Sequence, residues 1–244
     1  TYDRANHILT FGLDRWLWNR TAHAFRKTLE RPEAVVLDLC CGTGDMTMAL
    51  YKYRPQPQNR VPHLRDGRIV AKVGEAPQIS MEPGQPEPIL AADFSRPMLA
   101  LAEKKFAGHN ITSIEADALH LPFADNSIDL ITIAYGFRNL ASYEDGLAEL
   151  HRVLRPGGQI GILECNRPEG LTGAAYNLYF KKILPHIGGL ISGDRAAYTY
   201  LPASVERFPR PPRMLQLIQN AGFIQATWTS YTLGAAGLYR AAKP

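Results

Sequence analysis

Three groups of carboxylate and glycine residues could perform chemistry, and each comes directly after a short apolar run. In the first group, Asp38-Leu39-Cys40-Cys41-Gly42-Thr43-Gly44-Asp45, two glycines connect a β-branched run to a helical one. Glycine lets a ligand approach the main chain closely, and the N-terminus of the following helix attracts a carboxylate or a phosphate. An ordinary glycine turn is the alternative. Because the segment lacks both the third glycine of a dinucleotide fingerprint and the lysine of a P-loop, phosphate-centred chemistry is disfavoured.

The second group is Asp93-Phe94-Ser95-Arg96-Pro97-Met98-Leu99, and the third is Glu115-Ala116-Asp117-Ala118-Leu119-His120-Leu121-Pro122-Phe123. A carboxylate that follows the second strand can accept both ribose hydroxyls of an adenosine lying across the first two strands. The alternative is a helix N-cap, which Ser95 followed by Pro97 could provide instead. Asp117 would accept from an adenine amino group, although an isolated aspartate is usually a turn residue. Three such strand ends in succession favour an adenosine site.

The elements that must position these residues alternate between strand and helix patterns. We expect strands at 34–39, 89–92, 111–115, 128–134 and 159–165, and helices at 14–29, 45–53, 96–106 and 142–154. Arg155-Pro156-Gly157-Gly158 is a helix stop. After a helix near 211–220, strands at 223–231 and 235–242 would close the sheet as an antiparallel C-terminal hairpin. This order predicts a single α/β domain over residues 1–244, with a doubly wound, mostly parallel seven-stranded sheet and helices on both faces.

Two segments depart from the alternation. Residues 54–88 are rich in proline and hold only two strand-like pieces, Ile69–Val73 and Gln78–Met81, so we expect an inserted loop or hairpin. Residues 168–212 contain a helix pattern at about 172–184 and a Gly- and Tyr-rich connection, which predicts a helical cap over the site.

Composition excludes several classes of function. The formal net charge is +4 and the pI is near 9.0, but the basic residues are scattered, which disfavours nucleic-acid binding. Three cysteines follow neither disulfide nor metal-ligand spacing, so we expect no metal and a reducing cytoplasm. No apolar run is long enough for a membrane span. The first residue is Thr1 rather than Met, so we expect that a short segment precedes it.

The three groups, together with His151-Arg152-Val153-Leu154-Arg155-Pro156-Gly157-Gly158, resemble the successive motifs of Rossmann-like methyltransferases in order and spacing. Further stretches are similar to the ubiquinone/menaquinone biosynthesis C-methyltransferases, namely Tyr2-Asp3-x-x-Asn6, Phe11-Gly12-Leu13, Ala134-Tyr135-Gly136-Phe137-Arg138-Asn139 and Tyr198–Pro209. The resemblance covers nearly the whole chain except 54–88. Departures from the family's pattern are Cys41 in the glycine loop, Ala134 where relatives often have Ser, and the pairs Leu233-Gly234 and Tyr239-Arg240 near the C-terminus.

The resemblance implies an S-adenosylmethionine-dependent enzyme that methylates a ring carbon of a polyprenylated hydroquinone. Demethylmenaquinol is preferred over the ubiquinol precursor as its acceptor. The alternatives are another small aromatic or lipid acceptor, or a non-catalytic cofactor-binding partner in quinone biosynthesis. A cytoplasmic location fits, and the resemblance is compatible with weak contact at the inner face of the membrane and with a homodimer.

The resemblance also assigns residues to roles. The cofactor would contact Asp38, Gly42, Thr43, Gly44, Asp93, Phe94, Met98, Asp117, Ala118 and Ala134, and the acceptor would contact Tyr2, Asn6, Asn139, Tyr200 and Ser204. Arg138, Tyr135 and Asp3 are the candidate catalytic residues. Since arginine stays protonated, Arg138 would lower the pKa of the acceptor's phenol and hold its oxyanion, unless it is an ordinary surface ion-pair residue. The N-terminal residues could equally form a helix cap, and His151 is expected to be a cation at a helix C-terminus.

Overall fold

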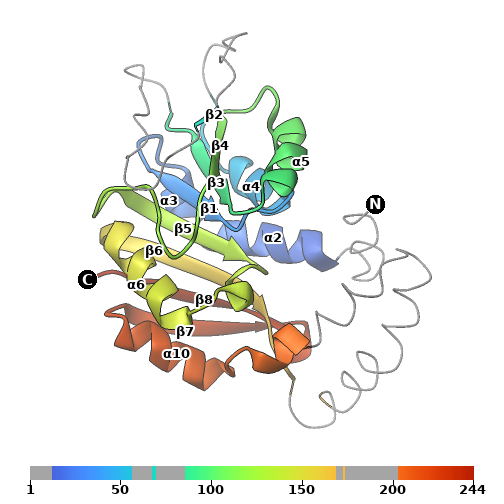
Figure 1. The fold of residues 1–244 in the computed structure, drawn as a ribbon, viewed down its shortest axis with the longest axis vertical. Coiled ribbons are helices and arrows are strands. Elements are labelled where there is room, and N and C mark those ends of the chain that lie inside the picture. The colour runs from blue at the N-terminus through green and yellow to red at the C-terminus, as the bar shows by residue number, and fades with distance from the viewer. Residues whose placement is uncertain (1–12, 57–67, 70–85, 169–172, 174–202) are drawn as a thin grey trace, which may run out of the picture.

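The computed structural model describes residues 13–56, 68–69, 86–168, 173 and 203–244. They form one sheet with the strand order β2-β4-β3-β1-β5-β6-β8-β7 (Figure 1). The strands are β1 (Val36–Leu39), β2 (Arg68–Ile69), β3 (Ile89–Asp93), β4 (Ile111–Glu115), β5 (Ile128–Ala134), β6 (Leu154–Cys165), β7 (Ile224–Tyr231) and β8 (Ala236–Ala242). All neighbours pair in parallel except β8, which is antiparallel to both β6 and β7. The doubly wound sheet and its antiparallel C-terminal hairpin are therefore confirmed.

The short strand β2 is an addition to the seven strands that the sequence predicts. It lies within the 54–88 segment, overlaps the strand-like piece at 69–73, and pairs with β4 at the edge of the sheet. Without β2, the remaining strands counted along the chain follow the order 3-2-1-4-5-7-6.

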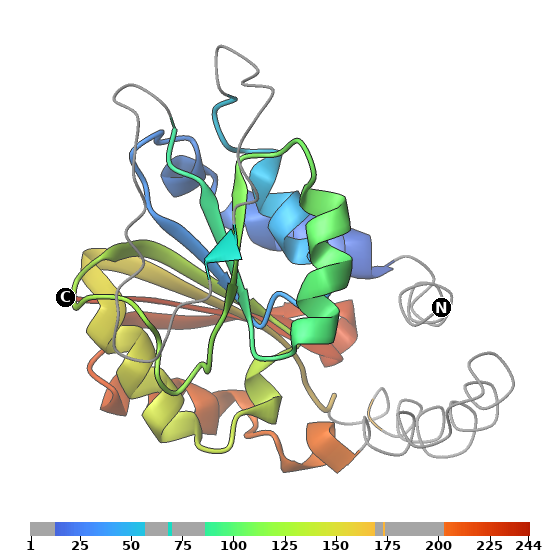
Figure 2. The ribbon, with the colours of Figure 1, turned by 45° about the horizontal axis from the view of Figure 1, so that its top comes forward.

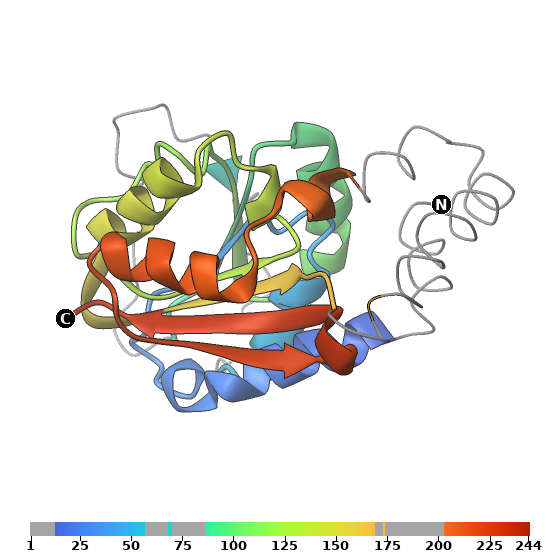
Figure 3. The same ribbon diagram turned by 90° about the horizontal axis from the view of Figure 1, so that it is seen from below.

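Helices cover both faces of the sheet. One face carries α2 (Leu13–Ala24), α3 (Arg26–Leu29), α4 (Asp45–Tyr51) and α5 (Arg96–Phe106), and the other carries α6 (Tyr143–Val153) and α10 (Pro211–Asn220) (Figures 1 and 3). Two 3₁₀ turns, η1 (Phe137–Asn139) and η3 (Thr232–Gly234), follow β5 and β7.

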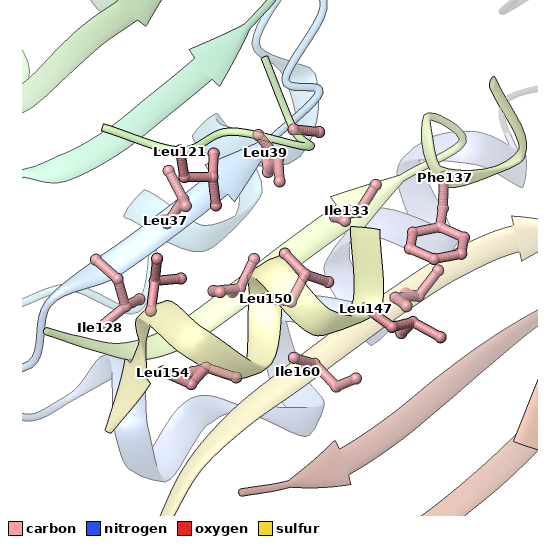
Figure 4. Close-up of a cluster of buried hydrophobic side chains, with 14 of the residues drawn as sticks. Leu37, Leu39, Leu121, Ile128, Ile133, Phe137, Leu147, Leu150, Leu154 and Ile160 are labelled. Atoms are coloured by element: carbon pink, nitrogen blue, oxygen red, sulfur yellow. The ribbon is translucent and has the colours of Figure 1, made fainter. Parts of the chain in front are cut away.

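The alternation of side chains along buried strands divides the core between these faces. Leu37 and Leu39 of β1 pack with Leu147 and Leu150 of α6 (Figure 4), whereas Val36 packs in a second cluster with residues of α2, α3 and α4. Because both faces are covered, β1 is buried along its whole length. The strand thus holds its C-terminal end rigidly in the middle of the sheet.

Two predicted boundaries are wrong for reasons of tertiary structure. The helix expected at 14–29 is broken at Phe25, whose ring packs against the sheet so closely that a Cβ on Gly161 would lie 2.4 Å from Phe25 Cε2. Strand β6 begins at Leu154, which pairs with Ile128, and not after Gly158. Gly157 nevertheless takes the positive φ, +76°, that the helix stop predicts.

Hydrogen bonds from one side chain hold both ends of the 54–88 segment close to the residues that precede β1. Arg54 is 4% exposed, and its guanidinium donates hydrogen bonds to the carbonyl groups of Leu29, Arg31, Pro32 and Glu87. The chain therefore leaves and re-enters the domain at the edge where the strands begin, opposite their carboxyl ends.

Several expectations fall outside the described residues. These are the site residues Tyr2, Asp3, Asn6 and Tyr200, the helix at about 172–184 and most of the 168–212 cap. Within the described part of the chain, no helix has the length and apolar character needed to cross a membrane.

Candidate functional site

The candidate site lies at the carboxyl ends of β1, β3 and β5. From β1 the chain continues to β3 on one side and returns with β5 on the other, so the strand order changes direction between β1 and β5. Open α/β sheets bind ligands in the crevice beyond such a point. The glycine loop after β1 and the start of α5 after β3 meet at this edge (Figure 2).

Asp93 joins these two loops. One carboxylate oxygen, Oδ2, accepts the Gly42 N–H at 2.8 Å, and the other, Oδ1, accepts the Ser95 N–H at 2.8 Å. Ser95 is the N-cap residue of α5, although its side chain makes no capping hydrogen bond. Asp93 thus orders the turn before α5 but is not its N-cap residue. Since a carboxylate oxygen has two lone pairs, each can still accept a further donor such as a ribose hydroxyl.

Among the described residues, the space in front of the glycine loop is open. Gly42 has φ +56°, and the only atom of that part of the chain that a Cβ built there would meet is Met98 Cε, at 4.0 Å. Phe94, which follows Asp93, is 77% exposed. An exposed ring, a thioether and a carboxylate thus border an opening that the main chain itself lines, which suits a nucleoside with an apolar base and a polar sugar.

Asp38 is fully buried beneath this loop. Its two oxygens accept the hydroxyls of Thr47 on α4, at 2.6 Å, and Thr132 on β5, at 2.8 Å. Burial is the main cause that raises the Asp38 pKa to about 7, while the two threonines oppose the shift. Both carboxylate oxygens are thus directed at other elements of the fold, and the side chain ties β1 to α4 and β5.

Thr43 and Gly44 fix the start of α4 against α5. Lys105 Nζ donates to Thr43 Oγ1 at 3.3 Å and to Asp45 Oδ1 at 2.8 Å. A Cβ on Gly44 would lie 2.5 Å from the Phe106 ring, so only glycine allows this approach. Lys105 did not stand out in the sequence, because a lysine in the last turn of a helix is ordinarily a solvated residue.

Asp117 forms a turn after β4. Its Oδ1 accepts the Leu119 N–H at 2.9 Å, its Oδ2 lies 3.5 Å from His120 Nδ1, and Ala118 beside it is buried. The turn alternative considered for this residue is therefore what the structure contains. As with Asp93, lone pairs remain for a further donor.

The loop after β5 packs in close contact with the loop after β1. A Cβ on Gly136 would lie 2.3 Å from Cys40 Cβ. Ala134 ends the strand, and Tyr135 has φ +59°, a conformation that non-glycine residues rarely adopt. Burial raises the Tyr135 pKa well above its usual value of 10.0. The side chain is therefore a neutral phenol, and a role as a phenolate base is disfavoured.

Arg138, in the 3₁₀ turn after β5, makes a buried ion pair. Its side chain is 11% exposed, and Nη1 lies 2.6 Å from Oε1 of Glu164, which is 0% exposed at the end of β6. Nη1 also donates to the Tyr135 carbonyl, and Nε donates to Ser204 Oγ at 3.3 Å. The surface ion-pair alternative for Arg138 is therefore wrong.

Sequence reasoning missed Glu164. A glutamate inside an apolar strand is a visible signal, since such a residue is rarely buried without a partner. Its partner is 26 positions away, however, and only the pairing of β5 with β6 identifies it.

Two expected acceptor contacts remain in the described part of the chain. Ser204 is fully buried and contacts Arg138, whereas Asn139, the next residue after Arg138, is exposed. The cysteines are free, and burial raises the pKa of both Cys40 and Cys165 to about 12, so these thiols are protonated at neutral pH. The described residues contain no cluster that could hold a metal ion.

His151 lies in the last turn of α6, as expected. Burial and the nearby Lys243 lower its pKa below the usual 6.5, which favours the neutral ring over the expected cation. It packs edge-on against Phe223 with a centroid distance of 5.1 Å, far from the carboxyl ends of the strands.

Comparison with known proteins decides the family. A model of the ubiE/COQ5 methyltransferase family matches residues 1–243. The chain belongs to this family. It is 38% identical to the demethylmenaquinone methyltransferase of Thermus thermophilus over 100% of this chain and 96% of that protein. It is 40% identical to the enzyme of the same name from Deinococcus radiodurans, over 98% and 86%. A ubiquinone/menaquinone biosynthesis C-methyltransferase of Shewanella putrefaciens is 33% identical, over 99% and 86%.

Solved structures support the fold of this ubiE/COQ5 family member. A Haloferax volcanii methyltransferase, solved with the Trm112 methyltransferase activator, superposes with a TM-score of 0.62 at 16% identity, covering 98% of this chain and 96% of that one. An S-adenosylmethionine-dependent methyltransferase of Aquifex aeolicus gives 0.55 at 16% identity, covering 90% and 93%. The chain is thus an S-adenosylmethionine-dependent C-methyltransferase of the ubiE/COQ5 family with a class I methyltransferase fold.

Proposed function

We propose that this chain transfers a methyl group from S-adenosylmethionine to a ring carbon of a polyprenylated hydroquinone, with demethylmenaquinol preferred over the ubiquinol precursor. The preference rests on the relatives: those at 38–40% identity are named demethylmenaquinone methyltransferases, whereas the Shewanella relatives at 32–33% carry the dual ubiquinone/menaquinone name.

The residues at the carboxyl ends of β1 and β3 suit the cofactor. Asp93 would accept the ribose hydroxyls, Phe94 and Met98 would pack on the adenosine, and the open main chain at Gly42 would admit the methionine portion beside α4. Asp117 and Ala118 would contact the adenine edge. When bound there, S-adenosylmethionine supplies an electrophilic methyl carbon, so the protein's task is to align and activate the acceptor carbon.

Arg138 would activate the acceptor. Ionising a ring hydroxyl raises the electron density on the adjacent carbon, and a nearby positive charge favours that ionisation. Of the Arg138–Glu164 pair, the guanidinium is the more exposed partner and the carboxylate the deeper one. The surface that the pair leaves exposed therefore belongs to the arginine side chain. This difference in exposure, at the loop that follows β5, is the observation that supports the assignment most strongly.

Arg138→Lys is the best test of this role. Alanine would leave the buried Glu164 without its charged partner, which typically costs about 3–5 kcal/mol of stability and confuses the result. Lysine keeps the charge but loses the planar fork, so turnover should fall by roughly 10–100-fold while the dissociation constant of S-adenosylhomocysteine changes by less than about threefold. A lysine variant that methylates at the parent rate would contradict the role of Arg138.

A lipid surface is the natural source of a polyprenylated acceptor, and we propose weak peripheral contact there. Leu13 and Trp16 of α2 and Leu233 of η3 are 48%, 49% and 82% exposed, and the Trp16 ring contacts Tyr231 next to η3. Trp16→Ser with Leu233→Ser should reduce co-sedimentation with anionic vesicles by at least about threefold. Ile224→Ser is the matched control, because Ile224 is 45% exposed at the start of β7, the other end of that strand. Equal binding by both variants would remove this proposal.

A further inference from the structure

The Glu164 carboxylate is the most completely buried charge at the carboxyl ends of β5 and β6, and it contacts the Arg138 loop in two ways. Oε1 pairs with Arg138 Nη1 at 2.6 Å, and Oε2 accepts the main-chain N–H of Arg138 at 3.1 Å. Oε1 also accepts the N–H of Cys165 at 2.8 Å. One carboxylate therefore fixes both the main chain and the side chain of the same arginine.

Glu164 is itself held from behind. The Asn166 amide donates to the Glu164 carbonyl at 3.1 Å, and the Tyr239 hydroxyl on β8 donates to Asn166 Oδ1 at 2.6 Å. Asn166 and Tyr239 are both buried. The antiparallel pairing of β6 with β8 thus fixes the main chain that carries Glu164, and the loop after β5 cannot shift without breaking the bonds between Arg138 and the carboxylate.

From this geometry we propose that Glu164 is a positioning residue, which holds the Arg138 guanidinium with its charge turned toward the acceptor. The inference rests on the proposed function, because it assumes that Arg138 acts on the acceptor's phenol. Glu164 has two effects that oppose each other. It fixes the orientation of the guanidinium, which speeds methylation, and its negative charge partly offsets the positive potential at the phenol, which raises the pKa of the bound acceptor.

Glu164→Gln separates these two effects. Glutamine keeps the shape but removes the charge, and its amide group faces N–H donors that the carboxylate accepted. The plateau value of kcat should fall by about 10–100-fold, because the guanidinium loses its fixed orientation. At the same time, the midpoint of the pH–kcat profile should move to lower pH, because the uncompensated guanidinium favours the phenolate more. A merely structural role would lower the plateau and leave the midpoint in place.

Asp129→Asn is the matched control. Asp129 is a carboxylate 15% exposed that pairs with Arg155 at 2.8 Å and accepts the Val35 N–H at 2.9 Å, but it lies where β5 begins, at the opposite edge of the sheet. Its profile should keep the parent plateau and midpoint. Binding of S-adenosylhomocysteine should stay within about threefold of the parent for every folded variant, since the cofactor is held by other loops.

The outcomes distinguish this inference from the proposed function. If Glu164→Gln keeps both plateau and midpoint while Arg138→Lys is impaired, the positioning role of Glu164 is wrong and the role of Arg138 stands. If Arg138→Lys matches the parent, the role of Arg138 is wrong and this inference fails with it, whereas absence of ring methylation by the parent protein is the result that would refute the proposed function. Should Glu164→Gln not fold, Glu164→Asp replaces it: the retained charge should keep the parent midpoint, and the shorter side chain should lower the plateau. An aspartate variant with the parent plateau would overturn the inference.

Discussion

Removing the Asp93 carboxylate should weaken cofactor binding in a way that can be traced to the ribose. A hydrogen bond to a charged group contributes roughly 1.5–3 kcal/mol, which corresponds to about 10–150-fold in a dissociation constant. Asp93→Ala should therefore weaken binding of S-adenosylhomocysteine by at least about tenfold. The same carboxylate accepts the Gly42 and Ser95 N–H groups at 2.8 Å, so part of the loss comes from loosening of the two loops.

A ligand cycle separates the two contributions. We expect the parent to bind S-adenosylhomocysteine at least about tenfold more tightly than its 2′-deoxy or 3′-deoxy analogue, because one charged hydrogen bond is lost. In Asp93→Ala this preference should shrink to less than about threefold, since no acceptor remains for the hydroxyl. Calorimetric titration of both ligands against both proteins measures it, with Asp129→Asn as the control. An alanine variant that keeps the parent's preference would show that other groups hold the ribose, and the assignment of Asp93 would be refuted.

Three further changes test other parts of the structure. The pKa of Asp38 is raised from 3.8 in the unfolded chain to about 7 in the folded one, so the free energy of unfolding falls as the pH rises through this range. In urea unfolding, the stability of Asp38→Asn relative to the parent should therefore increase by roughly 2–3 kcal/mol between pH 5 and pH 8. Gly136→Ala should cost about 1–3 kcal/mol in thermal unfolding, because its Cβ would lie 2.3 Å from that of Cys40, and Cys40→Gly should restore much of it; a double variant no better than the single would contradict this contact. Replacing 57–85 with a short Gly/Ser linker, while keeping the buried Arg54, should leave turnover within about threefold of the parent, since closing a loop costs little; an insoluble product would show that the segment belongs to the core.

The sequence predicts the bounds of a helix or strand correctly where residues within that element mark its ends. The bounds of α5, β4, β5 and α10 match the expected residues, because prolines begin both helices and the strands are short apolar runs. By contrast, the break of the first helix at Phe25 depends on a ring packing against Gly161 of β6. The hydrophobic period continues through Phe25 in the sequence, so no local pattern marks the break.

The candidate site divides in the same way. Asp93 and the open main chain at Gly42 could be predicted, because strand-end carboxylates and glycines stand next to apolar runs. The burial of Arg138 could not, because its partner comes from the neighbouring strand and 26 positions along the chain. The sequence predicts that Asp38 contacts the cofactor, but it does not predict the hydrogen bonds that its carboxylate accepts from Thr47 and Thr132. These partners of Asp38 lie on α4 and β5, so they are known only once the elements that pack against β1 are known.

We claim that this ubiE/COQ5-family chain methylates a ring carbon of a hydroquinone. The most direct test is a reaction of the purified protein with S-adenosylmethionine carrying a ¹³C methyl group and a short-chain demethylmenaquinol, with a parallel reaction on the short-chain ubiquinol precursor, followed by NMR of the products. We predict a new ¹³C signal at the shift of a methyl group on an aromatic carbon, and none at that of a methoxy group. A methoxy signal, or intact demethylmenaquinol and ubiquinol precursor after incubation with protein that binds S-adenosylhomocysteine, would contradict the claim.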